Sequence, residues 1–272
     1  MLSFALNQMT SPNATTLGLL DMAISIGFSG IELRNDLNTK IFTDISPEEV
    51  KIATKARGIR ILALAEVYAF NDNTPHSRKQ ILELVRLAQK CGAESIVLIP
   101  RVADQPTDRT SQRNQLQIAL TAIQPIFEDH GITALIEPLG FSNSTLRFKS
   151  DVVAVLNEMG SQNCFGLVHD TFHHALANET EIFAGATRIV HISGVQNPNI
   201  PIPLLKDEHR GLVDAKDRLG NLAQISELLA NGFSGPFSFE AFSKDIHELD
   251  DPTHKLLASA AFINSHVAKM VA

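Results

Sequence analysis

Four short apolar segments in the second half of the chain each end at or near a side chain that can bind a metal ion. They are ALIEPL with Glu137, GLVHD with Asp170, RIVHIS with His191 and FSFEAF with Glu240. Three carboxylates and one imidazole form a mainly oxygen-donor set, which suits Mg²⁺ or Mn²⁺ and would also bind Co²⁺ or Zn²⁺. Three neighbouring carboxylates would repel one another without a cation. The pattern therefore predicts one divalent metal site formed by these four residues.

Each of the four residues, taken alone, also has an ordinary structural explanation. A Glu or Asp at the end of a strand is often a helix cap, a solvated residue or a salt-bridge partner. The joint pattern is harder to explain in this way, because acidic side chains are rarely buried unless they are paired or bound to metal. We therefore favour the metal site.

Strand-like apolar runs alternate with segments of helical periodicity along the whole sequence. The eight strand-like runs are residues 2–8, 29–34, 60–67, 95–100, 133–139, 164–170, 188–194 and 235–242. The predicted helices cover residues 15–26, 46–57, 77–91, 113–129, 150–159, 174–183, 221–230 and 252–271. Ser46, Pro47 and Glu49 form a complete helix start, with a capping serine, a proline at the first position and a glutamate three residues after the cap.

The spacing of about 30 residues between strands is the size of one βα repeat. We predict the α/β class and one (β/α)8 TIM barrel, a single domain over residues 1–272. An open doubly wound sheet is the alternative, but no glycine-rich phosphate turn follows the first strand. In such a barrel, functional groups gather at the C-terminal ends of the strands, so the four candidate ligands can converge on one point.

The composition and net charge argue against several classes of protein. An apolar fraction of 44% describes an ordinary soluble protein with a large core, and a net charge of −7 argues against nucleic acid as the main partner. Cys91 and Cys164 do not form a disulfide framework, and each is expected to be a small buried side chain. Residues 1–13 do not read as a signal peptide, and no apolar run approaches the roughly 20 residues of a membrane span. We expect a cytoplasmic protein without a membrane partner.

The chain resembles the xylose-isomerase-like TIM barrel superfamily of sugar phosphate isomerases and epimerases, which also includes inosose dehydratases and endonuclease IV. Within it the sequence is most similar to 2-keto-myo-inositol isomerase-type proteins. The matching segments are IELR, LALAEVYAFND, ALIEPLGF, GLVHDTFHH, VHIS, DEHRGLV and FSFEAF, and they span essentially the whole chain. The ordered Glu, Asp-x-x-His, His and Glu pattern is specific to the superfamily, and much less so to one substrate.

The resemblance implies roles for individual residues. Glu137, Asp170, His191 and Glu240 match the four metal ligands of the family. His173 matches a histidine that lines the substrate pocket, and Arg210 matches a residue that binds substrate oxygens. Two segments depart from the family pattern, Ser193-Gly194 shortly after His191 and residues 213–217 in the following loop. Both departures leave the identity of the substrate open.

The activity implied is proton transfer next to the carbonyl of a small keto-sugar or keto-inositol. The enediolate that forms would be stabilised by the bound metal ion. One of Glu137 and Glu240 would remove the proton and the other would return one. A metal-dependent dehydratase of a cyclic keto-polyol is the main alternative, since it begins with the same proton removal. Assembly into a homo-oligomer is left open.

Further pocket residues are predicted from their positions at strand exits. Asn7, Arg34, Glu66 and Arg101 could meet the hydroxyl groups of a polyol, although Arg34 and Glu66 could equally form structural ion pairs. Tyr68 and Phe70 could contact a sugar ring or merely pack a loop onto the barrel rim. His76, His174 and His247 are expected to be surface or capping residues.

Two further functions are weighed. An endonuclease IV-like phosphodiesterase could use His173, Asp207 and His209 for an additional zinc ion. The histidines that such an enzyme needs after the third and fourth strands are absent from residues 66–71 and 99–101, and the net charge is negative. A non-catalytic sugar-binding relative would bind a polyol tightly without exchanging protons.

Overall fold

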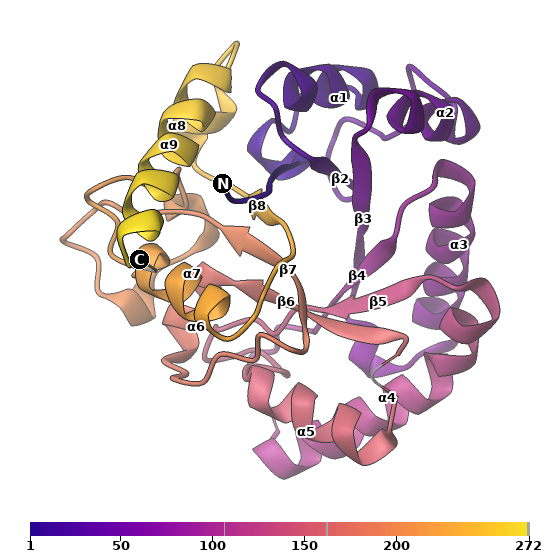
Figure 1. Ribbon diagram of the computed structural model, residues 1–272. Coiled ribbons are helices and arrows are strands. Elements are labelled where there is room, and N and C mark those ends of the chain that lie inside the picture. Colours follow the sequence, from indigo (N-terminus) through magenta and orange to yellow (C-terminus); the bar gives the residue numbers. More distant parts are fainter. Residues whose placement is uncertain (106, 162, 271–272) are drawn as a thin grey trace.

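The computed structural model describes residues 1–105, 107–161 and 163–270. Its eight parallel strands pair in chain order, and β8 pairs with β1, so the sheet closes into a barrel (Figure 1). The strands are β1 Phe4–Asn7, β2 Gly30–Arg34, β3 Arg60–Tyr68, β4 Ser95–Ile99, β5 Thr133–Ile136, β6 Phe165–Asp170, β7 Thr187–Ile192 and β8 Phe237–Phe239. The predicted TIM barrel is therefore confirmed, while its organisation as a single domain stays a prediction.

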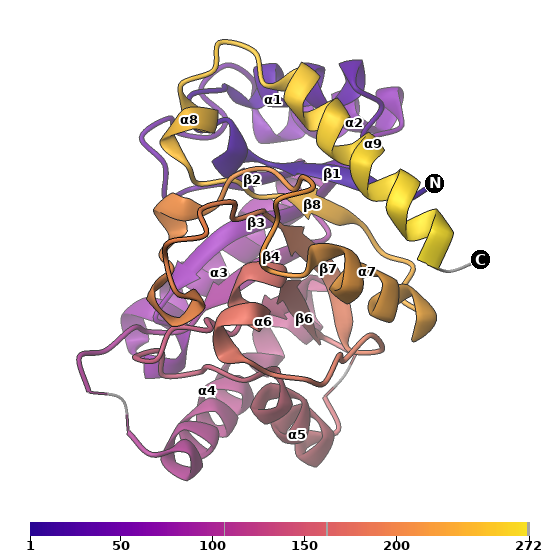
Figure 2. The same ribbon diagram turned by 90° about the vertical axis from the view of Figure 1, so that its left-hand side faces the viewer.

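Helices surround the barrel, and α9 lies between α7 and α1 in the ring (Figure 1). The helices are α1 Thr16–Ser25, α2 Pro47–Arg57, α3 Pro75–Cys91, α4 Arg109–His130, α5 Lys149–Met159, α6 Thr171–Ala177, α7 Asn221–Ala230, α8 Lys244–His247 and α9 Thr253–Met270. Figure 2 shows the barrel from the side, with the short α8 beyond the exit of β8. No helix in the described part of the chain is both long and apolar enough to cross a membrane.

Local sequence explains where the helices start and stop. Ser46 accepts a hydrogen bond from the backbone N–H of Glu49, and the Glu49 carboxylate accepts one from the N–H of Ser46, so the predicted capping box before α2 is confirmed. Gly58 ends α2 in the left-handed conformation, with φ at 67°. Such a φ favours glycine because a Cβ would be strained there.

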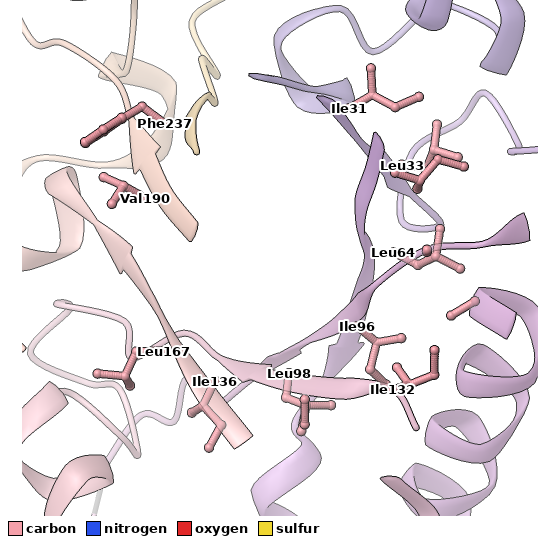
Figure 3. Close-up of a cluster of buried hydrophobic side chains, with 14 of the residues drawn as sticks. Ile31, Leu33, Leu64, Ile96, Leu98, Ile132, Ile136, Leu167, Val190 and Phe237 are labelled. Carbon is pink, nitrogen blue, oxygen red and sulfur yellow. The ribbon is translucent and has the colours of Figure 1, made fainter. Parts of the chain in front are cut away.

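The core has two layers. Side chains of one face of the strands point away from the barrel axis and pack against the helices, and Figure 3 shows Leu64, Leu98 and Val190 among them. Side chains of the other face, such as Val97 and Leu135, fill the barrel interior. Because both faces are covered, the strands are nearly continuous runs of buried residues, as expected for a parallel barrel.

Several predicted boundaries were wrong. The sixth helix begins directly after Asp170 and ends at Ala177, whereas the sequence predicted residues 174–183. It begins early because Asp170 caps it, and it ends early because Asn178 adopts a left-handed φ of 52°. The fifth and eighth strands end at Ile136 and Phe239, before the predicted residues 139 and 242.

Other boundaries differ less. The fourth helix starts at Arg109, capped by Asp108, rather than at residue 113. Residue 271, the predicted end of the last helix, lies outside the described residues. Both cysteines are free and buried, as expected.

Candidate metal centre

Four side chains from consecutive strands meet at the C-terminal end of the barrel. Asp170 ends β6, His191 is the second-last residue of β7, and Glu137 and Glu240 directly follow β5 and β8. All four are buried, and each offers one ligand atom that lies within 4.8 Å of the others. They could hold a metal ion. Among the residues that the structure describes, no other group of His, Cys, Asp and Glu has this geometry.

His191 lies between carboxylates on both sides of its ring. Its Nε2 atom is 3.1 Å from Glu32 Oε2, and its Nδ1 atom is 3.6 Å from Glu137 Oε2 and 3.3 Å from Glu240 Oε2. Nδ1 is buried and makes no hydrogen bond of good geometry. Burial lowers the pKa of His191, but Glu240, Glu32 and Glu137 together hold it well above its ordinary value. Nδ1 is therefore the ring nitrogen that faces the centre.

Arg210 neutralises two of the carboxylates. Its Nη2 atom donates to Asp170 Oδ2 at 2.5 Å and to Glu240 Oε2 at 2.7 Å. The guanidinium carbon lies 4.9 Å from the ring centroid of Phe172 and 4.3 Å from that of Phe242. The side chain is only 1% exposed, so these contacts hold it rigidly at the centre.

Arg34 neutralises a second set of carboxylates. Its Nη1 atom donates to Glu240 Oε1 at 2.8 Å, and its Nη2 atom donates to Glu66 Oε2 at 2.9 Å and Asp36 Oδ2 at 2.7 Å. Burial raises the pKa of Glu66 to about 7, although Arg34 acts in the opposite direction. Glu240 is thus held between two arginines.

The two glutamates that flank His191 have different electrostatic environments. Burial raises the pKa of Glu137, although His191 acts to lower it. Burial also acts to raise the pKa of Glu240, but His191, Arg210 and Arg34 hold it below its ordinary value. Two carboxyl groups with pKa values pushed in opposite directions around one point are a common arrangement for moving protons.

Comparison with known protein families identifies the family of this barrel. A model of the xylose isomerase-like TIM barrel family matches residues 20–266. The chain belongs to this family. An inosose isomerase of Bacillus subtilis (strain 168) is 26% identical over 259 residues, which cover 89% of this chain and 90% of that protein. An inosose isomerase of Bacillus velezensis is 25% identical over 245 residues, covering 85% and 84%.

Solved structures have the same fold. The crystal structure of a xylose isomerase domain-containing protein from Salmonella typhimurium LT2 matches with a TM-score of 0.86 and 28% identity, covering 99% of this chain and 97% of that one. The crystal structure of the IolI protein with a bound zinc atom also gives a TM-score of 0.86, at 21% identity, covering 100% and 99%. The resemblance seen in the sequence is therefore confirmed.

Most of the predicted substrate-binding residues of this xylose isomerase-like barrel lie at the centre. The Nδ2 atom of Asn7 donates to Glu240 Oε1 at 3.2 Å. His173 is buried, with its Nδ1 atom unpaired, and its ring lies 5.1 Å from that of Phe141 and 5.2 Å from that of Phe172. Together with Arg34, Arg210 and Glu66, these residues surround the four candidate ligands.

Arg101 is not brought to the centre in this way. Its Nε atom donates to Asp72 Oδ1 at 2.9 Å, and its side chain is 43% exposed. Tyr68 is half exposed, and its hydroxyl accepts a hydrogen bond from the N–H of Val102. Phe70 is fully buried in the layer between strands and helices, so it packs the loop onto the barrel.

The sequence analysis missed three buried polar residues beside the centre. Glu32 is fully buried in the middle of β2, and Lys149 and His169 are buried behind Asp170. Glu32 could have been found, because it is an acidic residue between Ile31 and Leu33 in an apolar strand. His174, expected to be a surface or capping residue, is partly buried, and its Nδ1 atom lies 2.5 Å from Lys149 Nζ.

Proposed function

We propose that this protein is a divalent-metal-dependent isomerase or epimerase that moves a proton next to the carbonyl of a small keto-sugar or keto-inositol. The observation that supports this most is the pair of buried glutamates around one histidine. Glu137 and Glu240 lie 3.6 and 3.3 Å from His191 Nδ1 and come from β5 and β8, which are not neighbours in the barrel. The relatives named inosose isomerase support the same substrate class.

The four candidate ligands fit a divalent cation. Three carboxylates and an imidazole supply the oxygen and nitrogen donors that such ions take, and the buried Nδ1 atom of His191 makes no hydrogen bond of good geometry. The zinc atom in the IolI crystal structure supports a divalent ion here as well. When bound, the ion supplies positive charge that stabilises the negative oxygen of the reacting carbonyl. Mg²⁺, Mn²⁺, Co²⁺ and Zn²⁺ are the candidates.

The protein's own side chains would transfer the protons and hold the reacting groups in place. Glu137 and Glu240 approach from different strands, so one can remove a proton from the substrate carbon and the other can return one. Arg34 and Arg210 hold Glu240 in place from two directions. Glu32 accepts a hydrogen bond from His191 Nε2, so Nδ1 is the nitrogen that would bind the ion once its proton has been displaced.

Substrate oxygens would be met by residues around this centre. His173 offers an unpaired, buried Nδ1 atom, and Asn7 offers a side-chain amide beside Glu240. Phe141 and Phe172 pack against His173 and present apolar surface that excludes water. Arg34, Glu66 and Arg210 complete the proposed set of substrate-binding residues, whereas Arg101 pairs with Asp72 and is left out of it.

The direct test is proton NMR in D₂O with purified protein, Mg²⁺ and a panel of keto-inositols and ketoses. We expect deuterium to enter next to the carbonyl while a new isomer accumulates. Glu240→Gln should abolish this exchange, whereas Glu94→Gln, at the opposite end of the barrel, should not. Loss of water from the substrate would identify a dehydratase instead. Absence of exchange with Mg²⁺, Mn²⁺ and Co²⁺ over the whole panel would contradict the proposal.

A further inference from the structure

A cluster of buried polar side chains lies behind the candidate metal centre, where β6 leads into α6. The residues from Asp170 to His173 form this elbow, which carries one candidate ligand and one candidate substrate-binding residue. Both carboxylate oxygens of Asp170 accept hydrogen bonds. Oδ1 accepts one from the N–H of His173 at 2.9 Å, and Oδ2 accepts one from Arg210. Any shift of the elbow therefore moves a candidate ligand.

We propose that Lys149 is a positioning residue which, together with Gln224, clamps this elbow from behind and fixes Asp170 for metal binding. The inference rests on the proposed function, because it takes Asp170 to be a metal ligand. Neither Lys149 nor Gln224 belongs to the set of residues around the metal centre. Both come from neighbouring helices, Lys149 from the first residue of α5 and Gln224 from α7.

Lys149 directs its ammonium group at three acceptors. Its Nζ atom lies 3.1 Å from His169 Nδ1, 2.5 Å from His174 Nδ1 and 3.8 Å from Glu179 Oε2. A lysine can only donate, so both ring nitrogens must be bare acceptors. The side chain is 5% exposed, and a buried ammonium without partners would be costly. The three acceptors give this buried ammonium group its partners.

Gln224 fixes the same histidine from the other side. Its Nε2 atom donates to the carbonyl oxygens of Thr171 at 3.1 Å and Leu219 at 2.8 Å, so its Oε1 atom must be an acceptor. Oε1 lies 2.9 Å from His169 Nε2, which therefore donates and carries the proton. His169 is thus a neutral ring protonated on Nε2, and this agrees with the bare Nδ1 that faces Lys149.

The contacts reach both neighbours of Asp170 in the chain. The side chain of His169, just before it, is held by Lys149 and Gln224, and the carbonyl of Thr171, just after it, is held by Gln224. His174 extends the clamp one turn along α6. Lys149 itself is fixed by Glu179, which accepts hydrogen bonds from the first N–H groups of α5. The elbow is therefore tied to α5 and α7 at once.

The test measures Mn²⁺ binding by electron paramagnetic resonance, without any substrate. Lys149→Met keeps the length of the side chain and removes its donors. Lys149 acts on Asp170 only through its chain neighbours, so we expect Mn²⁺ to bind about tenfold more weakly, the lower limit for the loss of a direct outer-shell partner. Lys51→Met is the control, because Lys51 also donates a hydrogen bond to a neighbouring helix, to the carbonyl oxygen of Gln89, but lies on the exposed side of α2. The control should bind Mn²⁺ like the wild type. If Lys149→Met does not fold, Gln224→Met tests the other arm of the clamp.

A second measurement does not depend on metal binding. Long-range ¹H–¹⁵N NMR of the metal-free wild type should show His169 as the neutral form protonated on Nε2, and Lys149→Met should change that signal. Unchanged Mn²⁺ affinity in folded Lys149→Met and Gln224→Met, with only a lower melting temperature, would overturn the positioning role. A His169 protonated on Nδ1 would also overturn it. A wild type that binds no Mn²⁺, Mg²⁺, Co²⁺ or Zn²⁺ would instead overturn the proposed function.

Discussion

Glu32 offers a sharp test of the proposed metal centre, because it touches only His191 among the candidate ligands. Glu32→Gln keeps the shape of the side chain and its hydrogen-bond acceptor while removing the negative charge. Glu32 Oε2 lies 3.1 Å from His191 Nε2. The two side chains are 0% and 1% exposed, so bulk water does not screen the effect of removing the charge. A carboxylate behind a ligating histidine increases the basicity of the ring and fixes its orientation.

The expected loss of Mn²⁺ affinity can be estimated from known effects of removing such outer-shell partners. Their loss typically weakens metal binding by about 10–100-fold, which corresponds to roughly 1.4–2.8 kcal/mol. Because the amide still accepts a hydrogen bond from Nε2, we expect the lower end, about tenfold. Isothermal titration of Mn²⁺ into metal-free protein at one fixed pH measures the change directly.

Asp151→Asn is the matched control for Glu32→Gln. Asp151 is also a buried carboxylate, 4% exposed, but it lies on α5 and pairs with Arg109 at the start of α4. Its substitution should leave Mn²⁺ affinity unchanged. Equal affinities in the wild type and in Glu32→Gln would refute the idea that Glu32 prepares His191, and an equal loss in both variants would show only a general effect of losing a buried charge.

Three further predictions concern stability. Ser46→Ala removes the cap of α2 and should lower the unfolding free energy by about 1 kcal/mol in urea; no change would contradict the capping role. Gly140→Ala should cost about 2–3 kcal/mol, because its Cβ would lie 2.1 Å from a backbone carbonyl oxygen of α6, whereas Gly185→Ala meets nothing within 4 Å; equal melting temperatures would refute this. Burial lowers the pKa of Lys149 to about 8, from 10.5. Between these values the unfolded chain binds more protons, so the native protein gains stability as pH rises. The stability of the wild type relative to Lys149→Met should therefore increase by about 3 kcal/mol over this range, and a constant difference would contradict the shift.

The sequence predicted the barrel and its four converging residues because both depend on local patterns. Apolar runs, helix caps such as Ser46 and helix-ending glycines such as Gly58 recur at the spacing of a βα repeat. Once the strands are placed, the polar residues at their exits lie around the mouth of the barrel. Glu137 and Glu240 were found in this way.

Residues behind the centre could not be found by the same reasoning. Lys149 begins a helix and would ordinarily be solvated, and nothing local reveals that His169 and His174 lie beside it. The clamp exists only because α5, α6 and α7 pack against β6 in three dimensions. Glu32 could be found only in part. Its place in an apolar strand marks it as unusual, but the sequence does not identify His191 as its partner.

Asp170 explains why the start of α6 was misplaced, and it yields a last prediction. Its carboxylate caps α6 through the N–H of His173 while its other oxygen faces the centre, so one residue fixes both the helix start and a candidate ligand. Asp170→Asn keeps a good helix cap but removes the charge, whereas Asp170→Ala removes both. Both variants leave Arg210 without this partner, so that cost cancels in a comparison of the two.

We therefore expect Asp170→Asn and Asp170→Ala to lose Mn²⁺ affinity alike, while Asp170→Asn is more stable by about 1 kcal/mol in urea unfolding. Equal stability of the two variants would mean that the hydrogen bond to the N–H of His173 does not hold the helix. Wild-type affinity in either variant would remove Asp170 from the ligand set. A difference in stability together with a shared loss of binding would show that this one carboxylate both caps α6 and takes part in metal binding.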